Sequence, residues 1–266
     1  MGLAGNASDF DKDWDSYSAL IDGRKDSPEW AVIREGRDSH WRELVRLPVD
    51  CEVLDAGCGN GDYTRLALQD GARVWAFDLS QEMVASTERR LAASGLDAEE
   101  LQVASVVEIP YPDDRFDVVL CFAVIDHVPD EKRQDAVREL VRVLKPGGTL
   151  FINTPNRYAY TWRVGHWLMR KLGRFPEGKI RWLSPGELRA LCVEADCQVG
   201  RSLGLELLPP FSGIYTSDLQ RITFLPEPVI AVLDRWYLRF EKRFRRYNLL
   251  KPLCFHYFLE ATKSGP

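Results

Sequence analysis

Short apolar runs alternate with amphipathic segments between residues 52 and 153. The runs that predict strands are Glu52–Ala56, Arg73–Phe77, Leu101–Ala104, Val118–Phe122 and Thr149–Asn153. The segments with helical periodicity are Tyr63–Gln69, Gln81–Ala93 and Glu131–Leu144. Short apolar strands that alternate with helices are typical of a parallel sheet covered by helices on both faces. Because crossovers between parallel strands are right-handed, the pattern predicts a doubly wound α/β fold.

Two later apolar runs extend this prediction. Gln198–Leu203 and Phe255–Thr262 can pair as a hairpin that closes the sheet, which would then be mostly parallel with seven strands. The residues between them, Leu205–Pro252, would form a helical insertion before the last strand. We therefore expect a single domain over residues 1–266. Its parts are an N-terminal helical lid in 1–47, a core in 48–204, a cap insertion in 205–252, and the last strand and tail in 253–266.

Aromatic residues near the N-terminus are spaced as on one face of a helix. Phe10, Trp14 and Tyr17 follow the i, i+4, i+7 pattern. Such a helix either closes over a ligand as a lid or packs on the core, and the spacing does not separate the two. A second packing helix is expected to contain Trp30, Trp41 and Leu44.

The composition argues against several classes of protein. Of the 266 residues, 45% are hydrophobic and 28% are charged, as in an ordinary globular domain. No run of about 18 apolar residues is present, so we expect no transmembrane helix. The first 25 residues are acidic and contain no apolar segment, so we expect no signal peptide. The six cysteines form no C-x-x-C pair, which predicts reduced thiols in a cytoplasmic protein, and no motif predicts a metal site.

The net charge of −5 hides a strong asymmetry. Residues 1–156 contain 17 basic and 30 acidic side chains, whereas residues 157–266 contain 18 basic and 10 acidic ones. Two segments of the second half, Arg157–Trp182 and Arg235–Lys251, are both basic and aromatic. Such segments either lie on the anionic inner face of a membrane or cap a substrate pocket, and the two interpretations are compatible. Neither segment contains an RNA-binding motif, so we predict no nucleic-acid partner, and the oligomeric state stays open.

The most informative motif is a glycine-rich turn in Val53–Asp62, where the sequence reads VLDAGCGNGD. A strand runs into this turn and a helix follows it, an arrangement that lets the backbone approach a ligand closely. The dinucleotide fingerprint G-x-G-x-x-G would require glycine at position 62, where this chain has Asp62. The motif therefore favours a cofactor without a pyrophosphate over NAD or FAD, and a plain tight turn is the alternative.

A second motif follows at the end of the second predicted strand. Asp78 stands there, and an acid at this place can accept hydrogen bonds from both hydroxyls of a ribose. The alternative is that Asp78 caps the following helix, a role that Ser80 can fill equally well. The glycine-rich turn and Asp78 together are far more specific than either one alone.

Further motifs carry a resemblance to a known family. They are IPYP from Ile109, DVVLCF from Asp117, DHVPD from Asp126, TPNR from Thr154 and LSPGEL from Leu183. Over roughly Phe10 to Gly204, the chain resembles the class I S-adenosylmethionine (SAM)-dependent methyltransferases, and among them the ubiquinone-biosynthesis O-methyltransferases. The resemblance implies a Rossmann-like methyltransferase fold and SAM as the cofactor. It further implies methyl transfer to an oxygen of a hydrophobic or lipid-like small molecule, such as a ubiquinone-type ring.

Several alternatives to this activity stay open. Another natural product or lipid is an alternative acceptor, because the insertion between the last two strands does not resemble the ubiquinone enzymes. A non-catalytic SAM-binding protein associated with a membrane is a further alternative. An oxidoreductase on a similar sheet is disfavoured by Asp62.

The resemblance also assigns cofactor contacts to individual positions. Phe122 stands where the family usually has a methionine against the adenine, and Ser105 where the family often has an aspartate. Arg37 stands where an arginine reaches the methionine moiety of SAM. The full set of expected cofactor residues is Arg37, Asp55, Gly57, Gly59, Asp78, Leu79, Ser105, Val106 and Phe122.

Methyl transfer to a hydroxyl also needs a base. His127 follows the fourth predicted strand, at the carboxyl edge where open α/β sheets bind ligands, and it is the expected catalytic residue. Capping a helix or packing beside the cofactor is the alternative role. Asp126 is expected to face solvent, and His166 is a second candidate base. The remaining histidines, His40 and His256, resemble ordinary surface or strand residues.

Overall fold

The computed structural model describes residues 38–160, 163, 164, 167, 171, 181–207, 227–244 and 248–265. Seven strands form one sheet in the order β3-β2-β1-β4-β5-β7-β6. The strands are β1 Glu52–Ala56, β2 Arg73–Asp78, β3 Glu100–Val103, β4 Phe116–Phe122, β5 Leu144–Pro155, β6 Cys197–Leu205 and β7 His256–Lys263. The helices are α3 Asp62–Gln69, α4 Gln81–Ala93, α5 Arg133–Arg142, α7 Pro185–Val193 and α9 Glu227–Phe244, with the 3-10 turns η1 Asp130–Lys132 and η2 Asn248–Leu253.

The pairing confirms the predicted fold class. Strand β1 pairs in parallel with β2 and β4, β2 with β3, and β4 with β5. The last strand, β7, lies between β5 and β6 and runs antiparallel to both. Its first residues therefore lie at the same edge as the carboxyl ends of the parallel strands. This edge is where ligands bind to open α/β sheets.

The fifth strand and the helix before it differ from the sequence prediction. The helix predicted to reach residue 144 ends at Arg142, and β5 begins at Leu144, five residues before the predicted start. Arg115 N and Phe116 N both donate to Val143 O, and Leu144 pairs with Phe116, so the sheet takes up the residues directly after Arg142. The first turn of the predicted helix is the separate 3-10 turn η1.

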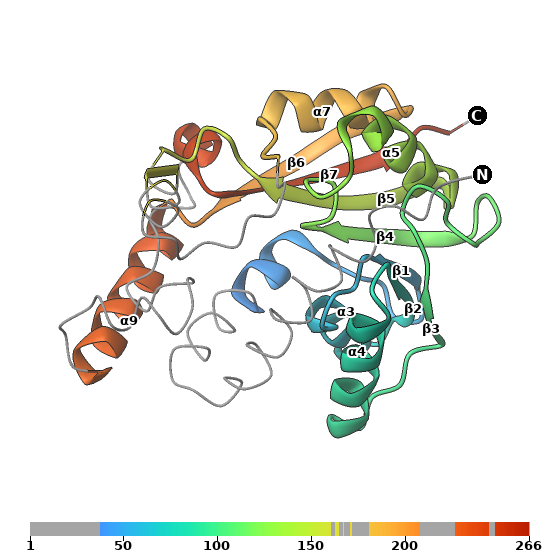
Figure 1. The fold of residues 1–266 in the computed structure, drawn as a ribbon, viewed down its shortest axis with the longest axis horizontal. Coiled ribbons are helices and arrows are strands. Elements are labelled where there is room, and N and C mark those ends of the chain that lie inside the picture. The colour runs from blue at the N-terminus through green and yellow to red at the C-terminus, as the bar shows by residue number, and fades with distance from the viewer. Residues whose placement is uncertain are drawn as a thin grey trace.

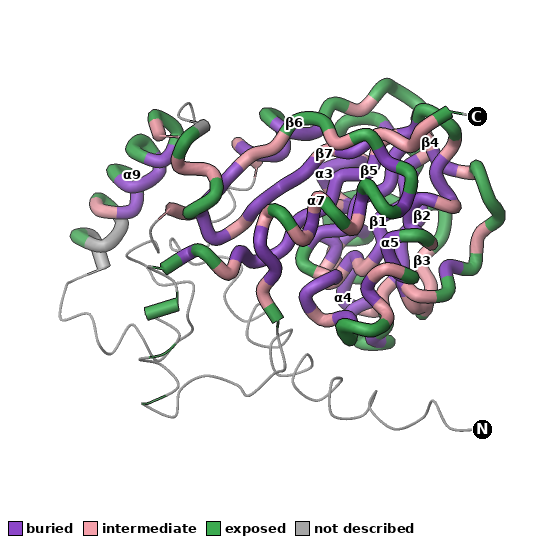
Figure 2. Tube along the Cα trace, turned by 90° about the horizontal axis from the view of Figure 1, so that it is seen from above, coloured by how far each residue is buried: buried purple, intermediate pink, exposed green. Residues whose placement is uncertain are grey.

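Two layers of helices cover the sheet. Figure 1 shows α5 and α7 on one face, and α3, α4 and the helical residues 38–44 on the other. Buried residues, purple in Figure 2, run through the middle of the sheet. Trp41 and Leu44 are buried in the second layer, and the Trp41 indole donates to Asp70 Oδ2 at 2.7 Å. These two residues therefore pack on the core as predicted, whereas residues 1–37 of the expected lid, with Phe10, Trp14, Tyr17 and Trp30, lie outside the described residues.

Side-chain caps fix where two of the helices begin. Ser80 Oγ accepts a hydrogen bond from Met83 N at the start of α4. At the start of α7, Ser184 Oγ accepts from Glu187 N while a Glu187 carboxylate oxygen accepts from Ser184 N. This reciprocal capping satisfies backbone donors that the first helical turn leaves free.

Residues between β6 and β7 contain α9 and η2. The turn η2 lies against β6 so closely that a Cβ at Gly204 would be 2.9 Å from Cys254 Sγ and from Lys251 Cα. Asn156 Nδ2 donates to the carbonyls of Pro252 and Cys254, which ties the end of η2 to β5. A helical insertion thus lies before the last strand and is held by hydrogen bonds to the sheet.

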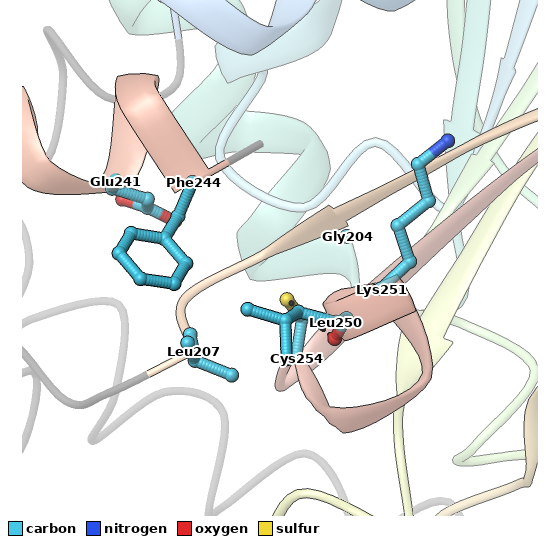
Figure 3. Close-up of a pocket in the computed structure, with 7 residues that line it drawn as sticks. All are labelled: Gly204, Leu207, Glu241, Phe244, Leu250, Lys251 and Cys254. Atoms are coloured by element: carbon cyan, nitrogen blue, oxygen red, sulfur yellow. Dashed lines mark hydrogen bonds between the residues drawn. The ribbon is translucent and has the colours of Figure 1, made fainter. Parts of the chain in front are cut away.

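A small pocket lies where α9 meets the sheet. Its lining residues are Gly204, Leu207, Glu241, Phe244, Leu250, Lys251 and Cys254 (Figure 3). Lys251 extends away from the other side chains, and its Nζ donates to Ser202 O at 2.6 Å. No described helix is long and apolar enough to cross a membrane.

Candidate cofactor and active site

The glycine-rich turn begins where β1 ends beside β2. Gly57 N and Cys58 N both donate to Phe77 O at 2.9 Å, so the turn is bonded to the neighbouring strand. Gly57 has φ +82°, and a Cβ built there would be 2.3 Å from Val124 Cγ2. Val124 comes from the loop after β4. Both the backbone conformation and this contact therefore require glycine at position 57.

Asp78 holds the turn from the end of β2. Its Oδ2 accepts from Gly59 N at 2.9 Å, and its Oδ1 accepts from Ser80 N at 3.0 Å. Burial raises the pKa of Asp78, while these backbone donors and the charge of His127 act in the opposite direction. Ser80 caps α4, so Asp78 is not needed as the cap. Each carboxylate oxygen keeps a lone pair for a further donor, such as a ribose hydroxyl.

Asp55 lies at the same edge but points into the protein. Thr64 Oγ1 of α3 donates to Asp55 Oδ2 at 2.6 Å, and the carboxylate is buried. Burial raises the pKa of Asp55 to about 7, and the nearby charge of Asp78 adds to this effect. The structure thus gives Asp55 a contact with α3, and its contact with a cofactor stays a prediction.

The residues expected around an adenine follow β2 and β3. Leu79 is half exposed directly after Asp78, where an apolar side chain can cover a ring. Ser105 forms an isolated bridge with Glu108, and its Oγ accepts from Val107 N at 3.4 Å. Val106 is buried. Asp78 pairs with Val103 in the sheet, so Ser105 and Val106 follow the neighbouring strand end.

Phe122 lies on the other side of the sheet from Val106. Its ring packs against Tyr63, with centroids 4.4 Å apart, and against Phe258 at 5.5 Å. Phe122 and Val106 belong to separate hydrophobic clusters. The contact of Phe122 with adenine stays a prediction.

The expected base lies in the loop after β4. His127 Nε2 is 3.4 Å from Asp126 Oδ2. Contrary to the prediction, Asp126 does not face solvent: it is 2% exposed, and its Oδ1 is buried without a hydrogen-bond partner. The backbone carbonyl of Asp126 accepts from Arg181 N, which holds the residue inward. Burial raises the pKa of Asp126, and the charge of His127 opposes this. His127 and Asp126 therefore form a pair in the loop after β4, at the carboxyl edge of the parallel strands.

Sequence reasoning missed a second polar pair at this edge. Asn153 Oδ1 accepts from Ala123 N at 2.6 Å, and Asn153 Nδ2 is 3.3 Å from His256 Nδ1. Burial lowers the pKa of His256 to about 4. His256 is thus a strand histidine, as predicted, but it lies at the ligand-binding edge. His40 is buried and lies 3.2 Å from the Tyr63 hydroxyl, so it is not a surface residue.

Two of the expected site residues lie outside the described residues. They are Arg37 and the second candidate base, His166. All six cysteines are buried, and none of them forms a disulfide.

The described residues fit SAM at the ends of β1 and β2. Gly59 has φ +54°, and no atom lies within 4 Å of where its Cβ would stand, so a ligand can approach the backbone there. Asp78 supplies acceptors for ribose hydroxyls, and Leu79 supplies an apolar surface. SAM contains no pyrophosphate, so the complete dinucleotide fingerprint is not needed for this ligand.

Comparisons with known proteins identify a methyltransferase domain. A family model described as a methyltransferase domain matches residues 54–152. A ubiquinone biosynthesis O-methyltransferase of Pseudomonas fluorescens (strain SBW25) is 31% identical over 162 residues, which is 59% of this chain and 69% of that protein. The sequence similarity thus includes the strands and turns that form the carboxyl edge.

Two solved structures share the fold. A SAM-dependent methyltransferase from Archaeoglobus fulgidus superposes with a TM-score of 0.58 at 17% identity, covering 86% of this chain and 94% of that one. The 4+2 cyclase SpnF superposes with a TM-score of 0.59 at 18% identity, covering 87% of this chain and 81% of that one. At this identity the likeness shows the fold alone.

Proposed function

Because the chain belongs to the class I SAM-dependent methyltransferases, we propose that it methylates an oxygen of a hydrophobic, lipid-like small molecule, such as a ubiquinone-type ring. The observation that carries the choice of oxygen is the Asp126–His127 pair after β4, in which the buried Asp126 Oδ2 lies 3.4 Å from His127 Nε2. The ubiquinone-biosynthesis relatives support the acceptor class by their names.

The proposed reaction requires the protein to position the acceptor and to accept one proton from it. When bound, SAM supplies a methyl group carried by a sulfonium. The leaving group is the neutral thioether, which needs no acid to protonate it. The protein has to hold the acceptor in line and exclude water. A phenolic hydroxyl must lose its proton as the new bond to carbon forms, and an imidazole is suited to accept it.

Asp126 supports His127 in this role. Its carboxylate faces Nε2 of His127 from a buried position, so it orients the ring and stabilises the positive charge that proton transfer creates. The orienting carboxylate beside a catalytic histidine works in this way in other enzymes. Asp126 is thus a positioning residue, and His127 is the proposed base.

An acceptor series tests this proposal. Purified protein is incubated with methyl-labelled SAM and a catechol that carries a polyprenyl tail, the same catechol without the tail, or an aniline with the tail. The proposal predicts label in the tailed catechol, much less in the bare ring, and none in the aniline. His127→Ala in the same assay is the control for the base.

Other outcomes would replace the proposal. Label on the aniline alone would mean a nitrogen acceptor. SAM binding without transfer to any compound of a lipid extract would favour the non-catalytic alternative. SpnF shows by its name that the fold also accommodates cyclisation, so product mass has to be measured alongside the label.

A further inference from the structure

Helix α9 leaves a row of apolar side chains exposed. Val229 is 41% exposed, Val232 48%, Trp236 69% and Phe240 39%. Their spacing of three and four residues places them on one face of the helix. Single exposed apolar residues are common, but a contiguous row along more than two turns marks an interaction surface.

Exposed basic residues flank this row on the same helix. They are Arg235, Arg239, Lys242 and Arg243. The acids Asp234 and Glu241 instead point into the protein, at 1% and 6% exposure. The outward half of α9 thus combines apolar and positively charged side chains, while these two acids lie on the inward half.

The orientation of α9 is fixed by its buried face. Tyr237 and Leu238 are buried, and a Glu241 carboxylate oxygen accepts from Glu206 N at the end of β6. Phe244 and Leu207 face each other across the pocket of Figure 3. Because these contacts hold the inner face against the sheet, the apolar row keeps pointing outward.

More exposed apolar residues lie at the same end of the molecule. Tyr160, Val164 and Trp167, which follow β5, are each about as exposed as Trp236. Figures 1 and 2 both show α9 and the described residues after β5 at the end opposite β3. Leu249 in η2 is also exposed. The exposed surface therefore extends beyond one helix.

We propose that the outward face of α9 docks on the surface of an anionic lipid bilayer. An amphipathic helix of this kind lies in the membrane interface, with Trp and Phe at the headgroup level and Arg and Lys on anionic lipids. The charge complementarity selects an anionic surface over a neutral one. The proposal rests on α9 and not on the proposed acceptor, although a lipid-like acceptor would be reached from the same bilayer.

Cosedimentation with vesicles tests the proposal without SAM or acceptor. Wild-type protein is mixed with phosphatidylcholine vesicles, with or without phosphatidylglycerol, at low and high salt. Arg235→Glu/Arg239→Glu reverses two charges on α9. The matched control, Arg89→Glu/Arg138→Glu, makes the same change of net charge at exposed arginines of α4 and α5. Trp236→Ala tests the apolar row separately.

The proposal predicts binding to phosphatidylglycerol vesicles that falls with salt and is weak on pure phosphatidylcholine. We expect Arg235→Glu/Arg239→Glu to weaken binding at least tenfold, Trp236→Ala severalfold, and the control pair less than twofold. Equal binding to both vesicle types, or equal losses in the α9 and control pairs, would overturn it. A concentration-dependent dimer that Trp236→Ala abolishes, without vesicle binding, would instead identify a second copy as the occupant. Methyl transfer to a detergent-dispersed acceptor would still stand in either case.

Discussion

The charged side chains at the ends of β1 and β2 are arranged differently from those of helix α9. At the strand ends, the acids Asp55 and Asp78 are turned inward and accept hydrogen bonds from Thr64, Gly59 and Ser80. On α9, two acids are also buried, but basic and apolar side chains remain outside. At the strand ends, the hydrogen bonds already hold the acids in place for a small ligand. On α9, only the inner face is packed against the rest of the protein. The proposed cofactor site and the proposed docking surface of α9 thus share no residue, so we expect substitutions to disturb them separately.

The largest effect is expected when the proposed base is removed, because this should lower the rate of methyl transfer but preserve SAM binding and vesicle binding. His127→Ala should lower kcat by about 10²–10⁴, because a positioned base contributes this much. SAM affinity should stay within a fewfold, and vesicle binding should not change. Steady-state kinetics with a saturating catechol acceptor measures kcat, and calorimetry measures SAM affinity. Loss of SAM affinity together with kcat would assign His127 a structural role beside the cofactor.

A substitution at Gly57 should weaken SAM binding without affecting α9. Gly57→Ala places a Cβ 2.3 Å from Val124 Cγ2 and forces alanine into a left-handed conformation, which costs about 1–2 kcal/mol. We expect SAM affinity to fall at least tenfold. Gly95→Ala is the matched control, because Gly95 follows α4, has a positive φ of +65°, and has no atom within 4 Å of its Cβ position. Adding Val124→Ala to Gly57→Ala should recover part of the affinity, and no recovery would contradict the proposed contact.

Asp55 should make the stability of the cofactor region depend on pH. Its pKa is raised to about 7 in the folded protein, above the value near 3.9 of an unfolded chain. Between these values the folded state binds more protons than the unfolded one, so stability falls as pH rises from about 4 to 7 and then levels off.

Asp55→Asn removes this titration, and Asn can still accept from Thr64. At pH 8 we expect the variant to be more stable than the wild type by about 1–3 kcal/mol. At pH 4 the gain should disappear. Denaturant unfolding at both pH values checks the difference, and a gain that is equal at both would show that burial does not hold the Asp55 pKa high.

The smallest effect is expected on the inner face of α9. Glu241→Gln keeps an acceptor for Glu206 N but removes a charge, so the free energy of unfolding should change by about 1 kcal/mol. Methyl transfer to a detergent-dispersed acceptor should stay within twofold of the wild type. A large loss of that activity would show that α9 takes part in the active site, and the comparison of two independent regions would fail.

The sequence predicts the cofactor edge well because its signals are local. The boundaries of β1 and α4 agree with the predicted Glu52–Ala56 and Gln81–Ala93. Gly57 and Asp78 belong to motifs whose position after a strand already determines their neighbours. The hydrogen bond between Gly59 and Asp78 therefore follows from two adjacent parallel strands.

Features that depend on distant segments were not predictable. Asp126 follows an apolar residue and precedes a histidine, and only the contact with Arg181 from another segment shows that it is buried. The pair of Asn153 and His256 joins residues about a hundred positions apart. For α9, the basic and aromatic composition was evident, but which face is buried depends on where β6 and η2 lie.

The most direct test of the cofactor site is calorimetric titration of SAM into the wild type and into Asp78→Asn. The substitution leaves one acceptor where the carboxylate had two, with Gly59 N, Ser80 N and the ribose hydroxyls all to be satisfied. A charge-assisted hydrogen bond contributes about 1.5–3 kcal/mol, so we predict SAM affinity at least tenfold weaker in a variant that melts cooperatively. Equal affinity in the two proteins would show that Asp78 only holds the turn and would contradict the site described for SAM.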